Sequence, residues 1–291
     1  MISMKIRENE PMRNHTTWRI GGPADRLVQP ESVEELRQAI QAARESGAPY
    51  YVIGGGSNLL VSDEGITGTV IQLGGSLTGL AITDHTIVAE AGVPLPFLAR
   101  KAAEYGLSGL EFAAGIPGSV GGAVFMNAGA YQGQISNVIE QVTCCDDSGQ
   151  LITLEAADCA FSYRNSRFKQ SRELVIVSVK MRLTPGKKED ILEQMQKNTA
   201  SRNAKQPVEY PNAGSIFKNP PGDAAGRLIE LAGAKGWRQG DAQVSEKHSN
   251  FIVNTGNASS RDVLLLVERV KQAVYAETGV LLEEEILYLG R

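Results

Sequence analysis

The chain has 291 residues, 42% of them hydrophobic and 21% charged, and its formal net charge is −4 at pH 7. This chain is longer than a single hydrophobic core usually supports, which predicts two or three packed units. Its ordinary composition excludes a disordered chain or a coiled coil. The negative charge argues against nucleic-acid binding, residues 1–11 lack the apolar region of a signal peptide, and no run reaches the roughly 18 to 20 apolar residues of a membrane span.

The sequence of the first half of the chain predicts an α+β architecture. A helix follows Ser32, which forms a capping box with Glu35, and it ends at Gly47. The short apolar strand Tyr50–Ile53 then leads into a glycine-rich loop. From there to about residue 183, a helix at residues 95–105 and several glycine-bearing turns alternate with strands. These strands are predicted at residues 70–73, 86–89, 138–145 and 174–181.

The second half begins with a polar breaker at residues 184–188, where we place a domain boundary. Two helices and a strand should follow at residues 189–203, 224–232 and 251–254. A longer helix is predicted at residues 262–277, capped by Ser259 or Ser260 and ended by Gly279. A last strand is expected at residues 285–289.

The cysteines give no sign of a metal site or a disulfide framework. Cys144, Cys145 and Cys159 have neither C-x-x-C spacing nor a nearby histidine, which is typical of reduced thiols in a core or strand. With no apolar leader or span, we expect a cytoplasmic protein that binds no metal, inserts into no membrane and binds no nucleic acid.

Two glycine-rich segments are candidates for cofactor binding. The first is Gly54, Gly55, Gly56, Ser57 and Asn58. Its backbone N–H groups suit a pyrophosphate, although a simple glycine-rich hairpin turn is an equal alternative on these residues alone. It matches neither G-x-G-x-x-G nor the Walker loop. The second segment has five glycines between residues 115 and 129. It favours close wrapping around an extended cofactor over a flexible surface loop, because several of its apolar residues require burial.

Three polar segments are candidates for chemistry. Arg164 and Arg167 offer fixed donors to a carboxylate or an enolate, and an exposed turn is the alternative. Ser215 lies between a glycine and two apolar residues and could donate a proton, although in isolation a turn or N-cap serine is favoured. The run from Glu283 to Glu285 precedes an apolar strand, and the sequence alone does not select a buried carboxylate among the three.

These segments together resemble the UDP-N-acetylenolpyruvoylglucosamine reductase family over nearly the whole chain. The resemblance rests on residues 14–17 and 20–22, the loop 54–58, and residues 115–130, 163–166, 213–220 and 282–285. Arg164 and Ser215 are close in sequence, so the chain resembles the shorter, second type. It departs from many members in having Leu287 two residues after Glu285, where they carry arginine.

The resemblance implies an FAD-binding fold of the vanillyl-alcohol-oxidase type in two α+β subdomains, residues 1–77 and 78–187. A linker helix and an α+β substrate-binding domain would occupy residues 188–279, with a returning strand at residues 280–291. Noncovalent FAD is expected, because the histidines and cysteines lie outside the glycine loops. Besides the loop 54–58, the implied FAD-binding residues are Gly115, Pro117, Gly118, Ser119, Gly122, Ala123, Asn127 and Gly129.

The resemblance also implies a reaction, that of UDP-N-acetylmuramate dehydrogenase. NADPH reduces the flavin and leaves, and UDP-N-acetylglucosamine enolpyruvate then takes its place and is reduced. Arg164 and Glu285 would stabilise the enolate, with Ser215 as proton donor. The implied substrate-binding residues are Lys205, Asn219 and His248. The rival hypotheses are an oxidase of the same fold, which needs no Ser215 motif, and a binding module without catalysis; a monomer is favoured.

Overall fold

The computed structural model describes residues 4–171 and 173–291. They form two compact units: residues 4–7, 26–55 and 68–202 make the first, and residues 8–25, 56–67 and 203–291 make the second. The chain passes between the units within strands β1 (Lys5–Pro11), β2 (Pro23–Gln29) and β5 (Ile66–Gln72). Each unit therefore combines segments far apart in sequence. The linear boundaries at residues 77, 187 and 279 stay a prediction.

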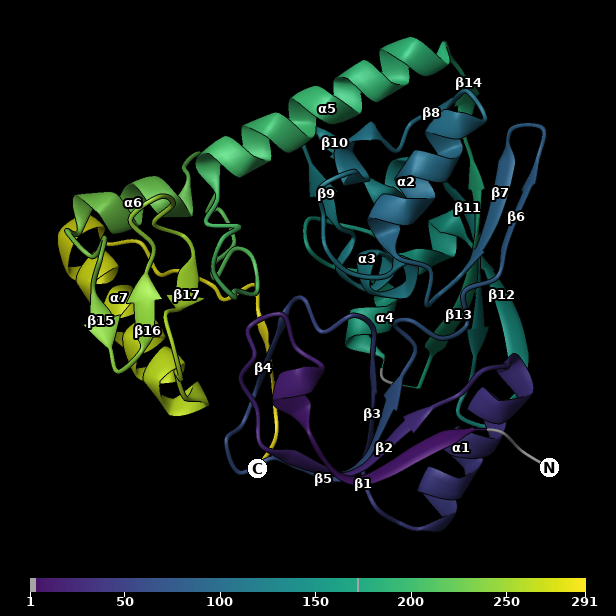
Figure 1. Ribbon diagram of the computed structural model, residues 1–291, viewed down its shortest axis with the longest axis horizontal. Coiled ribbons are helices and arrows are strands. Elements are labelled where there is room, and N and C mark those ends of the chain that lie inside the picture. The colour runs from purple at the N-terminus through teal and green to yellow at the C-terminus, as the bar shows by residue number, and fades with distance from the viewer. Residues whose placement is uncertain (1–3, 172) are drawn as a thin grey trace. The chain divides into compact units, whose positions relative to one another are not determined.

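A four-stranded sheet forms one part of the first unit, in the order β1-β2-β5-β3 (Figure 1). Strand β3 (Tyr50–Ile53) runs parallel to β5, which extends further towards the N-terminus than the predicted strand at residues 70–73. Helix α1 (Val33–Glu45) packs beside β3. Its N-cap, the Ser32 hydroxyl, accepts a hydrogen bond from the Glu35 N–H at 3.1 Å. The predicted capping box is incomplete, because the Glu35 carboxylate accepts instead from the Glu31 N–H.

A five-stranded antiparallel sheet forms the other part of the first unit, in the order β12-β11-β13-β7-β6. Helix α2 (Leu95–Glu104) follows strand β7 in the chain, and helix α3 (Val120–Met126) packs against β7 and β13 (Figure 1). The buried core of the unit joins these elements to α1 and β5. The strands are β6 (Leu80–Thr83), β7 (Thr86–Glu90), β11 (Ile139–Cys145), β12 (Leu151–Glu155) and β13 (Val175–Arg182).

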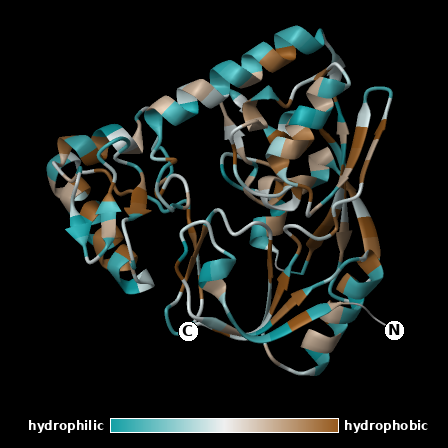
Figure 2. Ribbon diagram, viewed as in Figure 1, coloured by the Kyte–Doolittle hydropathy of each residue, from teal (hydrophilic) through white to brown (hydrophobic). Residues whose placement is uncertain are grey.

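Two further helices and two short ribbons belong wholly or partly to the first unit. Helix α4 (Arg167–Gln170) follows the arginine segment, and α5 (Lys188–Lys205) begins in this unit and ends three residues inside the second. Figure 2 shows that the surface of α5 is largely hydrophilic, and only Ile191 and Asn198 are buried on it. The predicted breaker contains a short strand, because β14 pairs with β8. The remaining ribbons are β8 (Leu107–Ser108) with β14 (Thr184–Pro185), and β9 (Gly129–Ala130) with β10 (Gly133–Gln134).

The second unit packs α6 (Ala225–Leu231) and α7 (Ser260–Thr278) with a three-stranded antiparallel sheet, β15-β16-β17. Ser259 and Asp262 form a complete capping box at the start of α7, and Gly279 ends it with φ +71°. The returning strand β18 (Leu287–Leu289) runs parallel to β4 (Leu59–Val61). The sheet strands are β15 (Arg238–Gln239), β16 (Ala242–Val244) and β17 (Ile252–Asn254).

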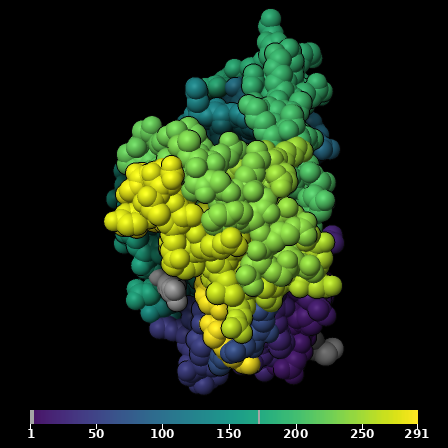
Figure 3. Space-filling view, turned by 90° about the vertical axis from the view of Figure 1, so that its left-hand side faces the viewer, coloured from purple at the N-terminus to yellow at the C-terminus, as the bar shows by residue number. Residues whose placement is uncertain are grey.

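Trp18 anchors the N-terminal segment of the second unit. Its ring is fully buried, its indole N–H donates to the Ile252 carbonyl at 3.0 Å, and its own carbonyl accepts from the Asn254 side chain at 3.1 Å. A buried indole with a satisfied N–H is stabilising, since the ring contributes a large apolar area. In Figure 3 the yellow C-terminal residues lie on the green residues of the same unit. No helix within the described ranges is long and apolar enough to cross a membrane.

Candidate active site

The two glycine-rich segments meet in the first unit. A Cβ placed on Gly54 would lie 2.4 Å from the Ser119 hydroxyl oxygen, and one on Gly55 would lie 3.4 Å from the Gly118 Cα. Gly118 has φ +126°, a conformation that side chains rarely adopt. Gly55 and Gly118 approach closely because neither carries a side chain, while Gly54 lies against the Ser119 hydroxyl. They form a cradle that a Cβ would partly fill, and exposed backbone amides of this kind suit a pyrophosphate.

The second segment is partly helical, not an open loop as its glycines suggest. Ser119 is the N-cap of α3, and its hydroxyl accepts a 3.3 Å hydrogen bond from the Gly122 N–H. The Val120 and Gly121 N–H groups donate to the carbonyls of Val93 and Ala91, both at 2.9 Å. The predicted burial is confirmed for Val120, Val124 and Met126 but not for Ile116 and Phe125, which are half-buried. The segment is thus fixed against the sheet before any ligand binds.

The rest of the first loop belongs to the second unit. Gly56 has φ +66°, and a Cβ there would lie 1.9 Å from the His15 carbonyl oxygen. The Thr17 N–H donates to the Gly56 carbonyl at 3.2 Å, and the Thr17 hydroxyl donates to the Asn212 carbonyl at 2.7 Å. The N-terminal motif therefore joins the glycine loop to the segment that leads to Ser215. Ser57 and Asn58 follow in the same unit.

Arg164 lies at the tip of a tight turn in the first unit. The Ser162 and Asn165 backbones bond to each other twice at 3.1 Å, and Arg164 has φ +54°. Its guanidinium donates to the Gly129 carbonyl at 3.2 Å and stacks 5.1 Å above the Tyr163 ring. A non-glycine residue held in this conformation costs about 1 to 3 kcal/mol, and such strain concentrates at functional sites.

Asn127 connects the second glycine segment to this turn. It has φ +44°, it is 1% exposed, and its side-chain amide donates to the Ser162 carbonyl at 2.9 Å. Its side-chain oxygen accepts from the Ser136 N–H at 3.3 Å. The amide of Asn127 thus supports the arginine turn, and its predicted contact with FAD stays a prediction.

Ser215 and Glu285 lie on neighbouring backbone segments of the second unit. Phe217 and Glu284 form an antiparallel bridge, and the Glu285 N–H donates to the Ile216 carbonyl at 2.7 Å. Ser215 is half-buried, caps no helix, and its hydroxyl bonds to none of the described residues. Of the two alternatives for an isolated serine, a turn or an N-cap, the N-cap therefore does not apply. The hydroxyl remains available for an external partner.

Two of the three consecutive glutamates at residues 283–285 form ion pairs with lysines. Glu283 is exposed and pairs with Lys218, and the Glu284 carboxylate accepts from the Lys271 ammonium at 2.9 Å. The hydrogen bond to Glu284 raises the pKa of Lys271, so this lysine stays charged at neutral pH. Glu285, which makes neither pair, is half-buried. This distinction agrees with its selection by the family pattern.

The three predicted substrate-binding residues all belong to the second unit. Lys205 is exposed at the end of α5, and the Asn219 side-chain oxygen accepts from the Ala225 N–H at 3.0 Å at the start of α6. A Cβ on Gly226 would lie 3.4 Å from the His248 ring, so Asn219 and His248 both adjoin the first turn of α6. Burial lowers the pKa of His248, and its Nδ1 accepts from the Asn250 N–H at 3.2 Å. His248 is therefore neutral at pH 7 with its proton on Nε2.

Sequence reasoning missed Arg202 on α5. Its guanidinium is half-buried, burial lowers its pKa, and it bonds to no acceptor among the described residues. Its side chain lies against Gly115, where a Cβ would be 2.9 Å from its Cδ. Desolvation disfavours the charged form of this partly buried side chain, which makes Arg202 a candidate for contact with an anionic ligand. Its sequence signal is weak, because it is one of several basic residues on a polar helix.

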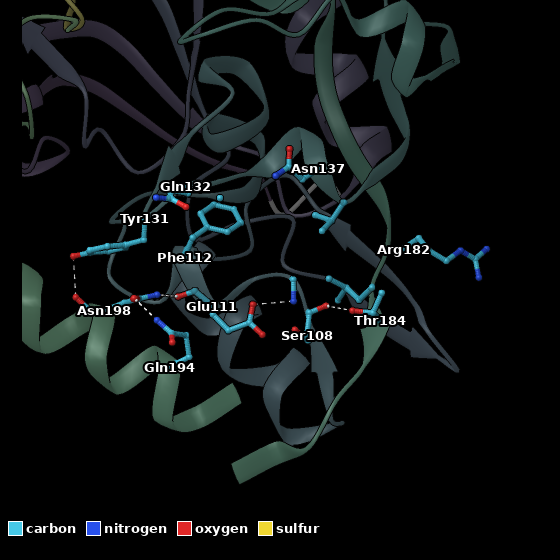
Figure 4. Close-up of a pocket in the computed structure, with 14 residues that line it drawn as sticks. Ser108, Glu111, Phe112, Tyr131, Gln132, Asn137, Arg182, Thr184, Gln194 and Asn198 are labelled. Atoms are coloured by element: carbon cyan, nitrogen blue, oxygen red, sulfur yellow. Dashed lines mark hydrogen bonds between the residues drawn. The ribbon is translucent and has the colours of Figure 1, made fainter. Parts of the chain in front are cut away.

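A pocket of about 500 Å³ lies elsewhere in the first unit (Figure 4). Its lining includes Glu111, Phe112, Tyr131 and Asn198. Asn198 links two of its walls: its backbone carbonyl accepts from the Tyr131 hydroxyl at 2.9 Å, and its side-chain amide donates to the Glu111 carbonyl at 3.0 Å. The Arg182 side chain points away from it. None of the sequence-predicted site residues lines this pocket.

The cysteines are buried free thiols, as expected. Burial raises the pKa of Cys144 to about 12 and that of Cys159 to about 11, so both stay protonated at neutral pH.

Comparisons with known proteins match both halves of the chain. Residues 24–155 match the FAD binding domain family, and residues 206–289 match the C-terminal domain of UDP-N-acetylenolpyruvoylglucosamine reductase. The reductases of Carboxydothermus hydrogenoformans and Symbiobacterium thermophilum are 47% and 46% identical, covering 99% and 98% of this chain and 95% and 92% of their own. The crystal structure of the Thermus caldophilus reductase superposes with a TM-score of 0.82 at 39% identity, covering 99% of this chain and all of that one.

The fold and the glycine cradle define an FAD-dependent oxidoreductase with the α+β fold of the vanillyl-alcohol-oxidase type. More particularly, the chain belongs to the UDP-N-acetylenolpyruvoylglucosamine reductase family. The fold class, the family and the FAD cofactor expected from the sequence are thereby confirmed. The roles of individual residues stay predictions.

Proposed function

We propose that the protein reduces UDP-N-acetylglucosamine enolpyruvate to UDP-N-acetylmuramate, with NADPH as electron donor, in cytoplasmic peptidoglycan precursor synthesis. The relatives at 46% and 47% identity, whose names specify this reductase, support the substrate class. The observation that carries the proposal is the free hydroxyl of Ser215 beside the backbone of Glu285. An oxidase of the same fold would need neither group.

We propose that FAD binds at the cradle formed by Gly54, Gly55 and Gly118, where a Cβ on Gly54 would lie 2.4 Å from the Ser119 hydroxyl oxygen. Noncovalent binding is proposed, with the pyrophosphate at the amides of this cradle. Arg202, half-buried beside Gly115, would supply an anion contact to the cofactor. When bound, FAD would supply the hydride-transfer chemistry that links NADPH to the terminal vinyl carbon of the sugar.

The residues of this chain would then control the charge that appears on the substrate. Addition of hydride to the vinyl carbon leaves an electron pair on the adjacent carbon, shared with its carboxylate. The guanidinium of Arg164 is proposed to stabilise this enolate, and Glu285 to assist it. The Ser215 hydroxyl then gives its proton to the same carbon, which completes the reduction. A serine of ordinary pKa can donate because the carbanion is a very strong base.

Contacts to the nucleotide would come from Lys205, Asn219 and His248. An exposed ammonium suits a phosphate, while the neutral His248 can donate one hydrogen bond from Nε2. Leu287 supplies none of the contacts made by the arginine of other members, because it is apolar and begins β18.

Replacement of Ser215 by alanine tests the assignment. We expect flavin reduction by NADPH to be nearly unchanged, and reoxidation by the enolpyruvyl sugar to slow by about 10²- to 10⁴-fold, the usual contribution of a general acid. Ser46→Ala, at the end of α1, is the control and should leave both half-reactions intact. Equal slowing of both half-reactions by Ser215→Ala would remove Ser215 from the role of proton donor.

A further inference from the structure

The side chain of Asn58 bonds to the backbone of Glu285. Its amide nitrogen donates to the Glu285 carbonyl at 3.0 Å, and its own backbone carbonyl accepts from the Leu287 N–H at 3.0 Å. One residue further along, Leu59 pairs with Leu287 as β4 and β18 begin their parallel ladder. Asn58 therefore extends the pairing beyond the ladder, to the predicted catalytic glutamate.

The opposite side of this backbone is held by the serine segment. The Glu285 N–H donates to the Ile216 carbonyl at 2.7 Å, and the Lys218 N–H donates to the Glu283 carbonyl at 2.8 Å. Glu285 thus has both its backbone N–H and its carbonyl engaged by residues more than 60 positions away in sequence. Its backbone position depends on Asn58 from one side and on the Ser215 segment from the other.

The serine segment is itself fixed by a buried amide. Asn250 is 3% exposed, and its side chain donates to the Phe217 carbonyl at 2.8 Å and accepts from the Phe217 N–H at 3.0 Å. Its backbone carbonyl accepts from the Ile216 N–H at 2.9 Å. Asn250 therefore fixes the serine segment on one side of Glu285, and the Asn58 side chain bonds the Glu285 carbonyl on the other.

We propose that Asn58 is a positioning residue, which sets the register of Glu285 against Ser215 for protonation of the substrate. The inference rests on the proposed roles of Glu285 and Ser215. It assigns the Asn58 side chain a task separate from the FAD contact expected of its loop, which backbone amides can make. Misplacement of a reacting group by about 1 Å can cost on the order of 10²-fold in rate. Loss of the Asn58 amide should therefore affect the step that uses Glu285 more than cofactor binding.

The test is a double-mutant cycle between Asn58→Ala and Glu285→Gln in the FAD-loaded full chain. We expect Asn58→Ala to keep FAD affinity and the rate of flavin reduction by NADPH within about twofold of wild type. Reoxidation by the enolpyruvyl sugar should slow by about 10- to 100-fold. In the Glu285→Gln background the same change should cost less than about twofold, because residues that act together are not additive.

Two further variants keep the result interpretable. Asn58→Asp preserves the side-chain shape but loses the amide donor when ionised, so it should repeat the slowing if Asn58→Ala fails to fold. Asn257→Ala removes an exposed asparagine of the same unit and is the control. Loss of FAD, equal slowing of both half-reactions, or undiminished slowing in the Glu285→Gln background would each overturn the inference. If the sugar fails to reoxidise wild-type enzyme, the proposed function fails first; if only Asn58→Ala has no effect, this inference alone fails.

Discussion

Replacing Gly54 by alanine should disturb the cradle through one defined contact. Gly54 does not have a positive φ, so alanine introduces no backbone strain there. Its Cβ would lie 2.4 Å from the Ser119 hydroxyl, whereas ordinary contact begins near 3.4 Å. The hydroxyl must move by roughly 1 Å, the difference between these distances. Ser119 is only 3% exposed, so it has little free space to move into.

The size of the effect follows from the function of that hydroxyl. Losing the N-cap of α3 costs about 1 kcal/mol, and overpacking a filled site costs about 1 to 3 kcal/mol. The sum, roughly 2 to 4 kcal/mol, should lower the Tm of the apoprotein by roughly 5 to 10 °C. If the same amides bind the pyrophosphate, FAD affinity should fall by about tenfold for each 1.4 kcal/mol lost.

Thermal unfolding of the apoprotein and FAD titration measure both effects. Ser119→Gly removes the colliding atom and by itself costs only a few tenths of a kcal/mol, so it should rescue Gly54→Ala. Gly47→Ala is the control: its Cβ meets nothing within 4 Å, and with φ +68° it should cost about 1 to 2 kcal/mol without changing FAD affinity. Wild-type Tm and FAD affinity in Gly54→Ala, or an additive loss in the double variant, would refute the reasoning.

Two further predictions concern charge. Burial lowers the pKa of His248 below 6.5, so the unfolded chain binds more protons between the lowered value and 6.5. The stability contributed by the neutral ring is complete above about pH 6.5 and is lost as pH falls through the lowered pKa. His248→Asn should therefore flatten this part of the profile of unfolding free energy against pH, measured by denaturant unfolding. An unchanged profile would contradict the lowered pKa. Arg202→Met should leave apoprotein Tm equal or higher, because burial disfavours the charged guanidinium, yet weaken FAD binding in titration. A lower apoprotein Tm with unchanged FAD affinity would make Arg202 a structural residue.

Local signals in the sequence predicted some elements well. Helix α7 combines a Ser259 cap, a regular apolar stripe and a terminal Gly279, and all three signals agree with the structure. Helix α3 was missed, because Gly121 and Gly122 are poor helix formers; its first turn is fixed by hydrogen bonds to the turn that follows β7. Strand β1 was missed because its mostly exposed residues show no apolar alternation.

Contacts between distant segments account for the rest of the site. Glycine density predicted cofactor-binding loops, but it could not show that Gly54 meets Ser119, 65 residues later. The bond from Asn58 to Glu285 spans 227 residues and depends on how β4 and β18 pair. The family pattern selected Glu285, and the structure adds that Glu283 pairs with Lys218 and Glu284 with Lys271.

The most direct test of the reductase function is anaerobic stopped-flow absorbance of the FAD-loaded protein. The flavin is first reduced with NADPH, and the reduced protein is then mixed with UDP-N-acetylglucosamine enolpyruvate. We predict rapid recovery of the oxidised flavin spectrum without oxygen, together with formation of UDP-N-acetylmuramate. A reduced flavin that only oxygen can reoxidise would contradict the account and indicate an oxidase of the same fold.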